Sequence, residues 1–176
     1  MVYIRQAALD DLQHVNMIRD MVLRAFCLVD GKIVDGDRVS IDELEQHIRG
    51  SDENILLLAM DSTTLPEKVV GTILISPMKE ELGHVRISML CVDPHCQSQG
   101  IGRRLMQDAL RLTRELGYST CVIHVFDIHQ DVITYFYKQK LGFVETGRMP
   151  FPLPALLKVP DVEFVVLEKS LVSLLS

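Results

Sequence analysis

The chain has 176 residues and a mass of 19.9 kDa, and its 18 lysine and arginine residues against 24 aspartate and glutamate residues give a formal net charge of −6. A composition with 48% hydrophobic and 24% charged residues excludes disordered and collagen-like chains, and the acidic balance argues against a general nucleic-acid binder. A chain of this length is expected to form one domain, over residues 1–176. No stretch approaches the roughly 18 consecutive apolar residues of a membrane span, and no leader pattern is present. We therefore expect the protein in the cytoplasm, with the nucleus left open.

The first part of the chain predicts a strand and a helix. Residues 2–6 have the pattern of a short strand, and from Asp10 to Phe26 apolar residues recur at helical spacing. Two Asp-Gly pairs then indicate a loop over residues 30–38.

A capping pattern opens the second predicted helix. Ser40 and Glu43 form the Ser-x-x-Glu capping box, and the helix is expected to reach Ile48. Three apolar runs separated by turn-forming residues follow, and they predict an antiparallel meander over residues 55–60, 69–75 and 85–92.

The second half of the chain alternates helices and strands. Residues 101–116 return to helical spacing, and Gly117 lies where such a helix would end. Beyond it we predict a strand over residues 121–126 and a helix over residues 131–140. A strand that starts at Leu141 and a closing strand over residues 162–167 are expected to follow. The prolines within residues 149–160 remove N–H donors and restrict φ, so this segment is expected to be an irregular connector, with a wall of the substrate site as the alternative.

The cysteines do not indicate a metal or disulfide site. None of the four forms a Cys-x-x-Cys pair or belongs to a Cys/His ligand cluster: Cys27, Cys91, Cys96 and Cys121. We therefore predict no metal and no disulfide framework, and we interpret Cys96 as a free loop thiol.

Residues 87–106 carry the chemistry-specific pattern. A strand ends at Val92, and a polar turn leads to Gly100-Ile101-Gly102 at the first turn of an amphipathic helix. Backbone N–H groups at a helix N-terminus have no intrahelical acceptor, and the helix dipole adds partial positive charge there. Glycine allows an anion to approach these N–H groups, and Arg103 adds a positive charge. The segment therefore predicts an anion site suited to phosphate.

This turn resembles one known phosphate-binding segment. A Rossmann fingerprint would need a third glycine where Leu105 stands, and no Walker A run is present. The run from Gln97 to Gly102, QSQGIG, instead resembles the Gln/Arg-x-x-Gly-x-Gly/Ala segment of the GCN5-related N-acetyltransferase (GNAT) superfamily. Tyrosines shortly before Gly142-Phe143 resemble its fourth-helix signature, and the order of predicted elements matches over nearly the whole chain.

The resemblance implies a fold and a cofactor. The fold is α/β (α+β), with a mixed, mostly antiparallel sheet of about seven strands that is splayed between strands four and five and flanked by about four helices. Acetyl-coenzyme A is the implied co-substrate. Its pantetheine arm would pair with the backbone of Leu90, Cys91 and Val92, and its pyrophosphate would bind at Gln97, Ser98, Gln99, Gly100, Ile101, Gly102 and Arg103. The asparagine that often follows strand five in this superfamily is absent, and this chain offers His129 or Gln130 in its place.

Acetyl transfer to an amine requires that the amine lose a proton and that the departing thiolate gain one. The resemblance implies a fourth-helix tyrosine as the acid. The usual spacing before Gly142 falls on Lys138, so Tyr137 fits only if the turn contains one additional residue. Tyr137 is our first candidate for the acid and Tyr135 the second.

For the base, relatives that use glutamate often place it on strand four or five, where this chain has Arg86 and His124. An imidazole with an unperturbed pKa of about 6.5 suits proton transfer near neutral pH. His124 is therefore the candidate base, with a chain of water molecules as the alternative.

The resemblance thus implies an acetyl-CoA-dependent N-acetyltransferase, an acyltransferase in which a primary amine attacks directly within a ternary complex. The alternative is a catalytically inactive coenzyme-binding or protein-interaction module, which the missing asparagine and the tyrosine spacing would favour. In this superfamily the segment between the first two helices borders the acceptor site. Its acidic residues predict a cationic small-molecule or peptide amine: Asp30, Asp35, Asp37, Asp42, Glu43 and Glu45. No nucleic-acid partner is predicted, and a homodimer is left open.

Overall fold

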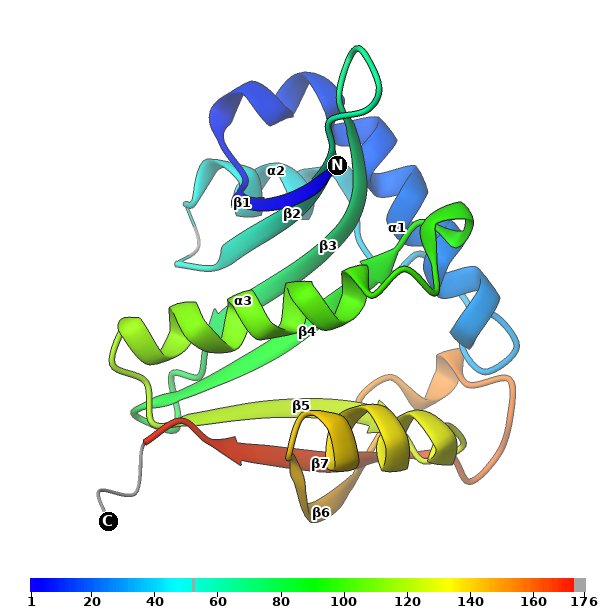
Figure 1. Cartoon of the computed structure of the whole chain (residues 1–176). Helices are drawn as coiled ribbons and strands as arrows, with labels where there is room; N and C mark the ends of the chain where they lie inside the picture. The colour runs from blue at the N-terminus through cyan, green and yellow to red at the C-terminus, as the bar shows by residue number, and fades with distance from the viewer. Residues whose placement is uncertain (52, 173–176) are drawn as a thin grey trace.

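A seven-stranded mixed sheet forms the centre of the computed structural model, which describes residues 1–51 and 53–172 (Figure 1). The strand order is β1-β2-β3-β4-β5-β7-β6. The strands are β1 (Val2–Gln6), β2 (Ile55–Asp61), β3 (Lys68–Pro77), β4 (His84–Val92), β5 (Thr120–Phe126), β6 (Val144–Pro150) and β7 (Glu163–Ser170). Neighbouring strands are antiparallel except β4 and β5, which run parallel. The predicted mixed, mostly antiparallel sheet is confirmed.

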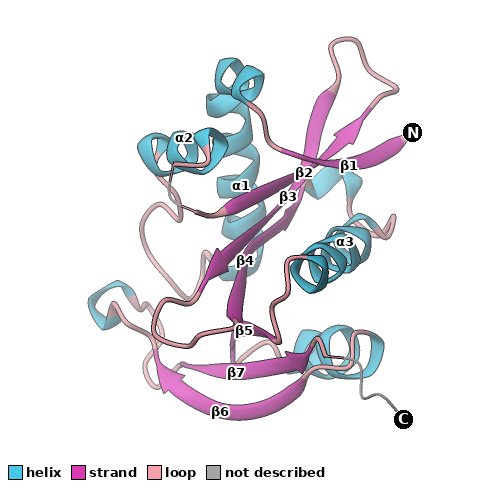
Figure 2. Cartoon of the chain, turned by 90° about the vertical axis from the view of Figure 1, so that its left-hand side faces the viewer, coloured by secondary structure: helices cyan, strands magenta, loops and turns pink. Residues whose placement is uncertain are grey.

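Helices cover both faces of the sheet. The longer ones are α1 (Val15–Asp30), α2 (Ile41–Arg49), α3 (Ile101–Glu115) and the π-helix η3 (Val132–Lys140), and the short 3₁₀ segments are η1 (Leu9–His14), η2 (Pro94–Cys96) and η4 (Pro154–Leu156). Figure 2 shows α1 and α2 on one face and α3 on the other. No helix within the described residues combines the length and apolar character needed to cross a membrane.

Two apolar layers hold the helices against the sheet. On one face, Leu105 and Ala109 of α3 and Ile133 of η3 pack against β-strand residues such as Ile123. On the other face, a second buried cluster joins α1, α2 and the sheet through Ile18, Leu44, Leu58 and Leu74, among others. The alternation of side chains along each strand supplies both layers, so both faces of the central strands are apolar.

The predicted capping box is present at the start of α2. The Ser40 hydroxyl accepts a hydrogen bond from the Glu43 N–H at 3.2 Å, and the Glu43 carboxylate accepts one from the Ser40 N–H at 2.8 Å. Gly50 ends the helix with a φ of +64°. These local signals explain why the bounds of α2 agree closely with the prediction.

Three predicted segments differ from the structure. The first helix continues beyond Phe26 to Asp30, and the 3₁₀ segment η1 precedes it. The strand predicted to start at Leu141 starts at Val144, because Gly142 turns the chain with a φ of +72°. Pro150, predicted to lie in an irregular connector, ends β6; β6 is an edge strand, where a residue without an N–H donor is tolerated.

The sheet splits between β4 and β5. Only the first part of the two strands is paired, with Arg86 opposite Val122 as the last pair. A bulge in β4 accompanies the split: the register with β3 shifts there, and Met89 has a φ of +52°. The Thr72 hydroxyl of β3 donates a 3.0 Å hydrogen bond to the Met89 carbonyl. The predicted splay between strands four and five is therefore confirmed.

Candidate active site

A cleft of ≈ 860 Å³ opens where β4 and β5 separate. Because strand side chains alternate between the two faces, residues from both faces line it. The half on the α3 face includes Leu90, Val92, Gly100, Arg103, Met106 and Tyr137. The half on the α1 face includes Phe26, Asp30, Arg38, Arg86, His124 and Phe126. We refer to these as the α3 half and the α1 half of the cleft.

The turn before α3 presents unpaired backbone N–H groups. Within the described part of the chain, none of the N–H groups from Gln97 through Arg103 donates a hydrogen bond to protein, whereas the next one, of Arg104, binds the Gly100 carbonyl at 3.0 Å. Ser98 and Gly100 have φ values of +62° and +76°. Successive N–H groups in such a turn form a concave anion site, to which the N-terminus of α3 adds partial positive charge.

The two glycines of the turn have different roles. A Cβ at Gly100 would meet no atom within 4 Å, so its left-handed φ rather than crowding favours glycine there. A Cβ at Gly102 would lie 3.5 Å from Val92 Cγ2, an ordinary contact. Gly100 thus shapes the turn, and Gly102 leaves space beside it.

Two residues that the sequence analysis did not single out support this region. A Cβ at Gly71 would lie 2.9 Å from Leu105 Cδ1 and 3.0 Å from the Cys91 carbonyl oxygen, so glycine permits α3 to pack closely on the sheet. Thr72 is fully buried and binds the bulge at Met89. Both lie inside an apolar strand. The one sequence signal for them is that a glycine and a polar threonine interrupt this apolar run.

The two candidate tyrosines lie in different environments. Tyr137 lines the cleft, and its ring makes edge-on contacts with Phe136 at 5.0 Å and Phe143 at 6.0 Å between centroids. Burial, and then the neighbouring Cys91, Asp30 and Cys121, raise the pKa of its phenol above the usual value of 10.0, so the hydroxyl stays protonated. The Tyr135 side chain is 58% exposed and is not among the lining residues.

The π-helical form of η3 explains the tyrosine spacing. A π turn holds one more residue than an α turn, and the Phe143 N–H binds the Tyr137 carbonyl at 3.0 Å where the helix ends. Tyr137 therefore reaches the cleft although it stands one residue further from Gly142 than the usual pattern.

His124 lies on β5 in the α1 half of the cleft. Its ring packs beside Phe164, with 5.7 Å between centroids. Burial, and then the positive charge of Arg86, lower the pKa of His124 below its usual value of 6.5. The imidazole is therefore neutral at neutral pH and able to accept a proton.

His129 lines the cleft but is bound to another side chain. Its Nε2 lies 2.7 Å from Asp30 Oδ1, and the Arg38 Nη2 donates to Asp30 Oδ2 at 3.0 Å. The Arg38 guanidinium also lies over the rings of Phe26 and Phe126, at 4.9 and 5.9 Å. Gln130, the other candidate for this position, is not a lining residue and donates to the backbone of Asp127.

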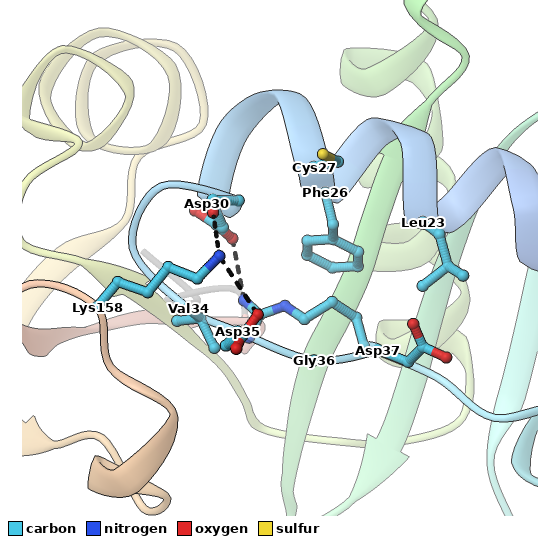
Figure 3. Close-up of a pocket in the computed structure, with 11 residues that line it drawn as sticks. Leu23, Phe26, Cys27, Asp30, Val34, Asp35, Gly36, Asp37 and Lys158 are labelled. Carbon is cyan, nitrogen blue, oxygen red and sulfur yellow. Dashed lines mark hydrogen bonds and ion pairs between the residues drawn. The ribbon is translucent and has the colours of Figure 1, made fainter.

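Asp30 and Arg38 also border a smaller side pocket of ≈ 230 Å³, drawn in Figure 3. Lys158, from the segment before β7, lies across its mouth, where its Nζ donates to the Gly31 carbonyl at 3.0 Å and lies 3.3 Å from Asp35 Oδ1. No group of three or more histidine, cysteine, aspartate or glutamate side chains arranged to hold a metal is found among the residues that the structure describes.

Comparison with known proteins agrees with this geometry. A family model described as the acetyltransferase (GNAT) family matches residues 22–143. The human protein N-acetyltransferase 8B is 33% identical over 103 residues, which cover 56% of this chain and 44% of that protein. The matched segment therefore spans less than half the length of this curated relative.

Solved structures share the fold over nearly the whole chain. The structure of smu.2055 from Streptococcus mutans UA159 has a TM-score of 0.75 and 23% identity, and the match covers 97% of this chain and 99% of that one. The structure of yncA from Salmonella typhimurium with its cofactor acetyl-CoA has a TM-score of 0.72 and 19% identity, with 99% and 96% covered. Because the family model matches more than half of the sequence and the folds agree, this chain belongs to the GNAT acetyltransferase family.

Proposed function

We propose that residues 1–176 form a single domain that transfers an acetyl group from acetyl-coenzyme A to a primary amine by direct attack within a ternary complex. One observation carries the proposal: the turn with the free N–H groups of Gln97–Arg103 and the split between β4 and β5 line the same cleft. A ligand whose diphosphate binds this turn can extend a narrow arm into the split.

The residues of the α3 half fit coenzyme A. The N–H groups from Gln97 through Arg103 match a diphosphate, and the Arg103 side chain adds a cation at the same place. Beyond Arg86, β4 has no β5 partner, so the backbone of Leu90, Cys91 and Val92 is placed to pair with an extended arm. When bound, acetyl-coenzyme A supplies an acetyl group activated as a thioester.

Proton transfer is proposed for two side chains of the cleft. Tyr137, protonated and facing the cleft, is placed to donate a proton to a departing thiolate. His124, neutral at pH 7, is placed to accept a proton from the amine. Arg86 cannot act as the base, because a guanidinium does not lose its proton in proteins.

The cysteines of the cleft support direct transfer. Burial raises the pKa of the Cys91 thiol to about 12, and burial followed by Asp93 raises that of Cys96. A protonated thiol is a poor nucleophile, so neither side chain is suited to carry the acetyl group as a covalent intermediate.

The Tyr137→Phe variant tests this function. Thiol release from acetyl-coenzyme A is followed over a panel of amines. We expect kcat to fall about 100-fold or more, the usual size of a lost general acid, while the retained ring keeps its contacts with Phe136 and Phe143. Coenzyme affinity, measured by calorimetry, should be unchanged.

Tyr135→Phe distinguishes the two candidates, since the exposed Tyr135 should be dispensable. A fall in kcat in this variant alone would transfer the role of acid to Tyr135. Coenzyme binding by the wild-type protein without turnover of any amine would identify an inactive coenzyme-binding module instead.

A further inference from the structure

The α1 half of the cleft contains a cation without a partner. Arg86 lies on β4 opposite Val122, at the point where the sheet splits, and it shares the α1 face with His124. Its charge contributes to the lowered pKa of His124, so the two side chains are close. Among the described residues, no carboxylate forms an ion pair with Arg86, although it lines a largely apolar cleft.

Three aspartates near this half of the cleft pair with cations, and Glu168 of β7 lies on the same side of the sheet as Arg86, one strand beyond Val122. Asp30 binds both Arg38 and His129, Asp35 pairs with Lys158, and Asp37 pairs with Arg19. Figure 3 shows Asp35 beside its partner Lys158. Negative charge that could balance Arg86 is therefore not supplied by the segment that carries these three aspartates.

An unpaired arginine affects which amines can enter. Arg86 is exposed, and a protonated amine that approaches it meets a like charge, an interaction that water weakens. A negative group on the same molecule would remove this repulsion. The planar guanidinium of arginine binds a carboxylate with two parallel hydrogen bonds, an interaction that lysine does not reproduce.

The remaining wall of this half is aromatic. Phe126 and Phe164 stack with 4.6 Å between ring centroids. The Arg38 guanidinium lies over the rings of Phe26 and Phe126, at 4.9 and 5.9 Å, and all three rings line the cleft. Arg38 is bound by Asp30, and the candidate base His124 adjoins this surface through its contact with Phe164. The aromatic surface therefore suits an apolar group.

We propose that the acceptor is an amine with a carboxylate on the adjacent carbon and an apolar side chain, an apolar amino acid in chemical class. Arg86 binds the carboxylate, and Phe26, Phe126 and Phe164 contact the side chain. This inference rests on the proposed acetyltransferase function and names its substrate class. Peptide N-termini and polyamines lack the adjacent carboxylate and are poorer acceptors.

The test compares acceptors that differ only at the carboxylate. Initial rates of thiol release are measured with L-phenylalanine and L-leucine, their amides, and 2-phenylethylamine and isopentylamine, each corrected for the unprotonated fraction of the amine. We expect kcat/KM to be at least about tenfold higher for the acids, equivalent to about 1.4 kcal/mol.

Variants assign this preference to Arg86. Arg86→Gln should reduce the acid-to-amide ratio to near one, mainly through KM, and Arg86→Lys should restore part of it. At pH 8, where the His124 imidazole is neutral with or without the nearby positive charge, the rate with the amides should not fall. The affinity for acetyl-coenzyme A should be unchanged. Arg111→Gln is the matched control, because Arg111 lies on α3 with 62% of its side chain exposed and pairs with Asp108 and Glu115.

Each outcome decides a separate point. If the wild-type protein uses the amides or the decarboxylated amines as well as the acids, or if Arg86→Gln keeps the preference for acids, the substrate class is wrong and the acetyltransferase function stands. If none of these amines is acetylated while others in the wider panel are, the substrate class is likewise wrong. If no amine of any kind is acetylated, the proposed function itself fails.

Discussion

Single residues determine the backbone geometry of the turn before α3, where we expect an anion to bind. Gly100 has a φ of +76°, a conformation that costs an L-residue about 1–2 kcal/mol. Gly102 has ordinary helical backbone and room for a methyl group beside Val92. The two glycines of the motif are therefore not equivalent.

This difference gives a prediction. Gly100→Val should weaken acetyl-coenzyme A binding about tenfold or more, because a change in φ moves the N–H groups apart, and a tenfold loss corresponds to about 1.4 kcal/mol. Isothermal calorimetry measures the affinity. Gly102→Ala is the control and should bind nearly as well as the wild type; equal losses in both variants would contradict the assignment.

The neutral state of His124 has consequences for pH dependence. Its pKa is lower in the folded protein than the usual 6.5, so between the two pKa values the unfolded chain binds more protons. Protonation of His124 therefore does not affect the free energy of unfolding above pH 6.5, and it lowers this free energy as the pH falls from 6.5 through the folded pKa. We expect wild-type stability, measured by urea unfolding, to decrease from pH 7.5 to 5.5 more than that of His124→Gln.

The same variant tests the base. If His124 accepts the proton, kcat/KM of the wild type, corrected for the unprotonated fraction of the amine, should decline below pH 6.5, and His124→Gln should lose both activity and this acidic limb. An unchanged pH profile in His124→Gln would favour a chain of water molecules.

At the scale of elements, the bulge in β4 shapes the cleft. It shifts the register with β3 and gives Met89 a φ of +52°, three residues beyond the last pair between β4 and β5. The Thr72 hydroxyl is bonded to the Met89 carbonyl, so a buried polar group of one strand stabilises an irregularity in the next. Bulges commonly redirect backbone groups beside active sites.

Thr72→Val should therefore affect both stability and binding. Loss of this hydrogen bond is expected to lower the free energy of unfolding by about 1 kcal/mol and to raise the Kd for acetyl-coenzyme A severalfold as the bulge relaxes. Urea unfolding and calorimetry measure the two effects. Thr72→Ser keeps the hydroxyl and should retain affinity; if Thr72→Val loses stability but binds normally, the bulge does not depend on this bond.

The whole molecule assembles the cleft from segments far apart in the chain. Residues of α1, β4, α3, β5 and η3 meet only because the sheet order places β4 beside β5 and the helices lie on both faces (Figures 1 and 2). A ligand that binds both the turn and the split contacts several of these elements at once. Binding should therefore stabilise the fold as a unit.

Acetyl-coenzyme A at 100 times its Kd should add about 2.7 kcal/mol to the free energy of unfolding. For a domain of this size that is a rise in Tm of roughly 5–10 °C, which differential scanning fluorimetry detects. Pantetheine, which lacks the diphosphate, should produce a much smaller shift at the same concentration. An equal shift with pantetheine would show that the turn at Gln97–Arg103 does not bind the diphosphate.

The sequence by itself determined the features that depend on neighbouring residues. Strand alternation, the Ser40 capping box and the glycine turn at residues 100–102 are encoded within a few positions, so the elements and this turn were predictable. Anion binding at the turn stays a prediction. Most element bounds follow the prediction closely for the same reason.

Only the tertiary structure decided the chemistry of the cleft. The bulge at Met89, the contact of Asp30 with His129 and the lack of an ion pair at Arg86 among the described residues depend on residues distant in sequence. Local periodicity carries no information on such contacts. A pKa, a charge balance or a strand separation depends on the residues that pack against a side chain in the folded protein. A turn or a helix cap depends on the backbone next to it in the chain.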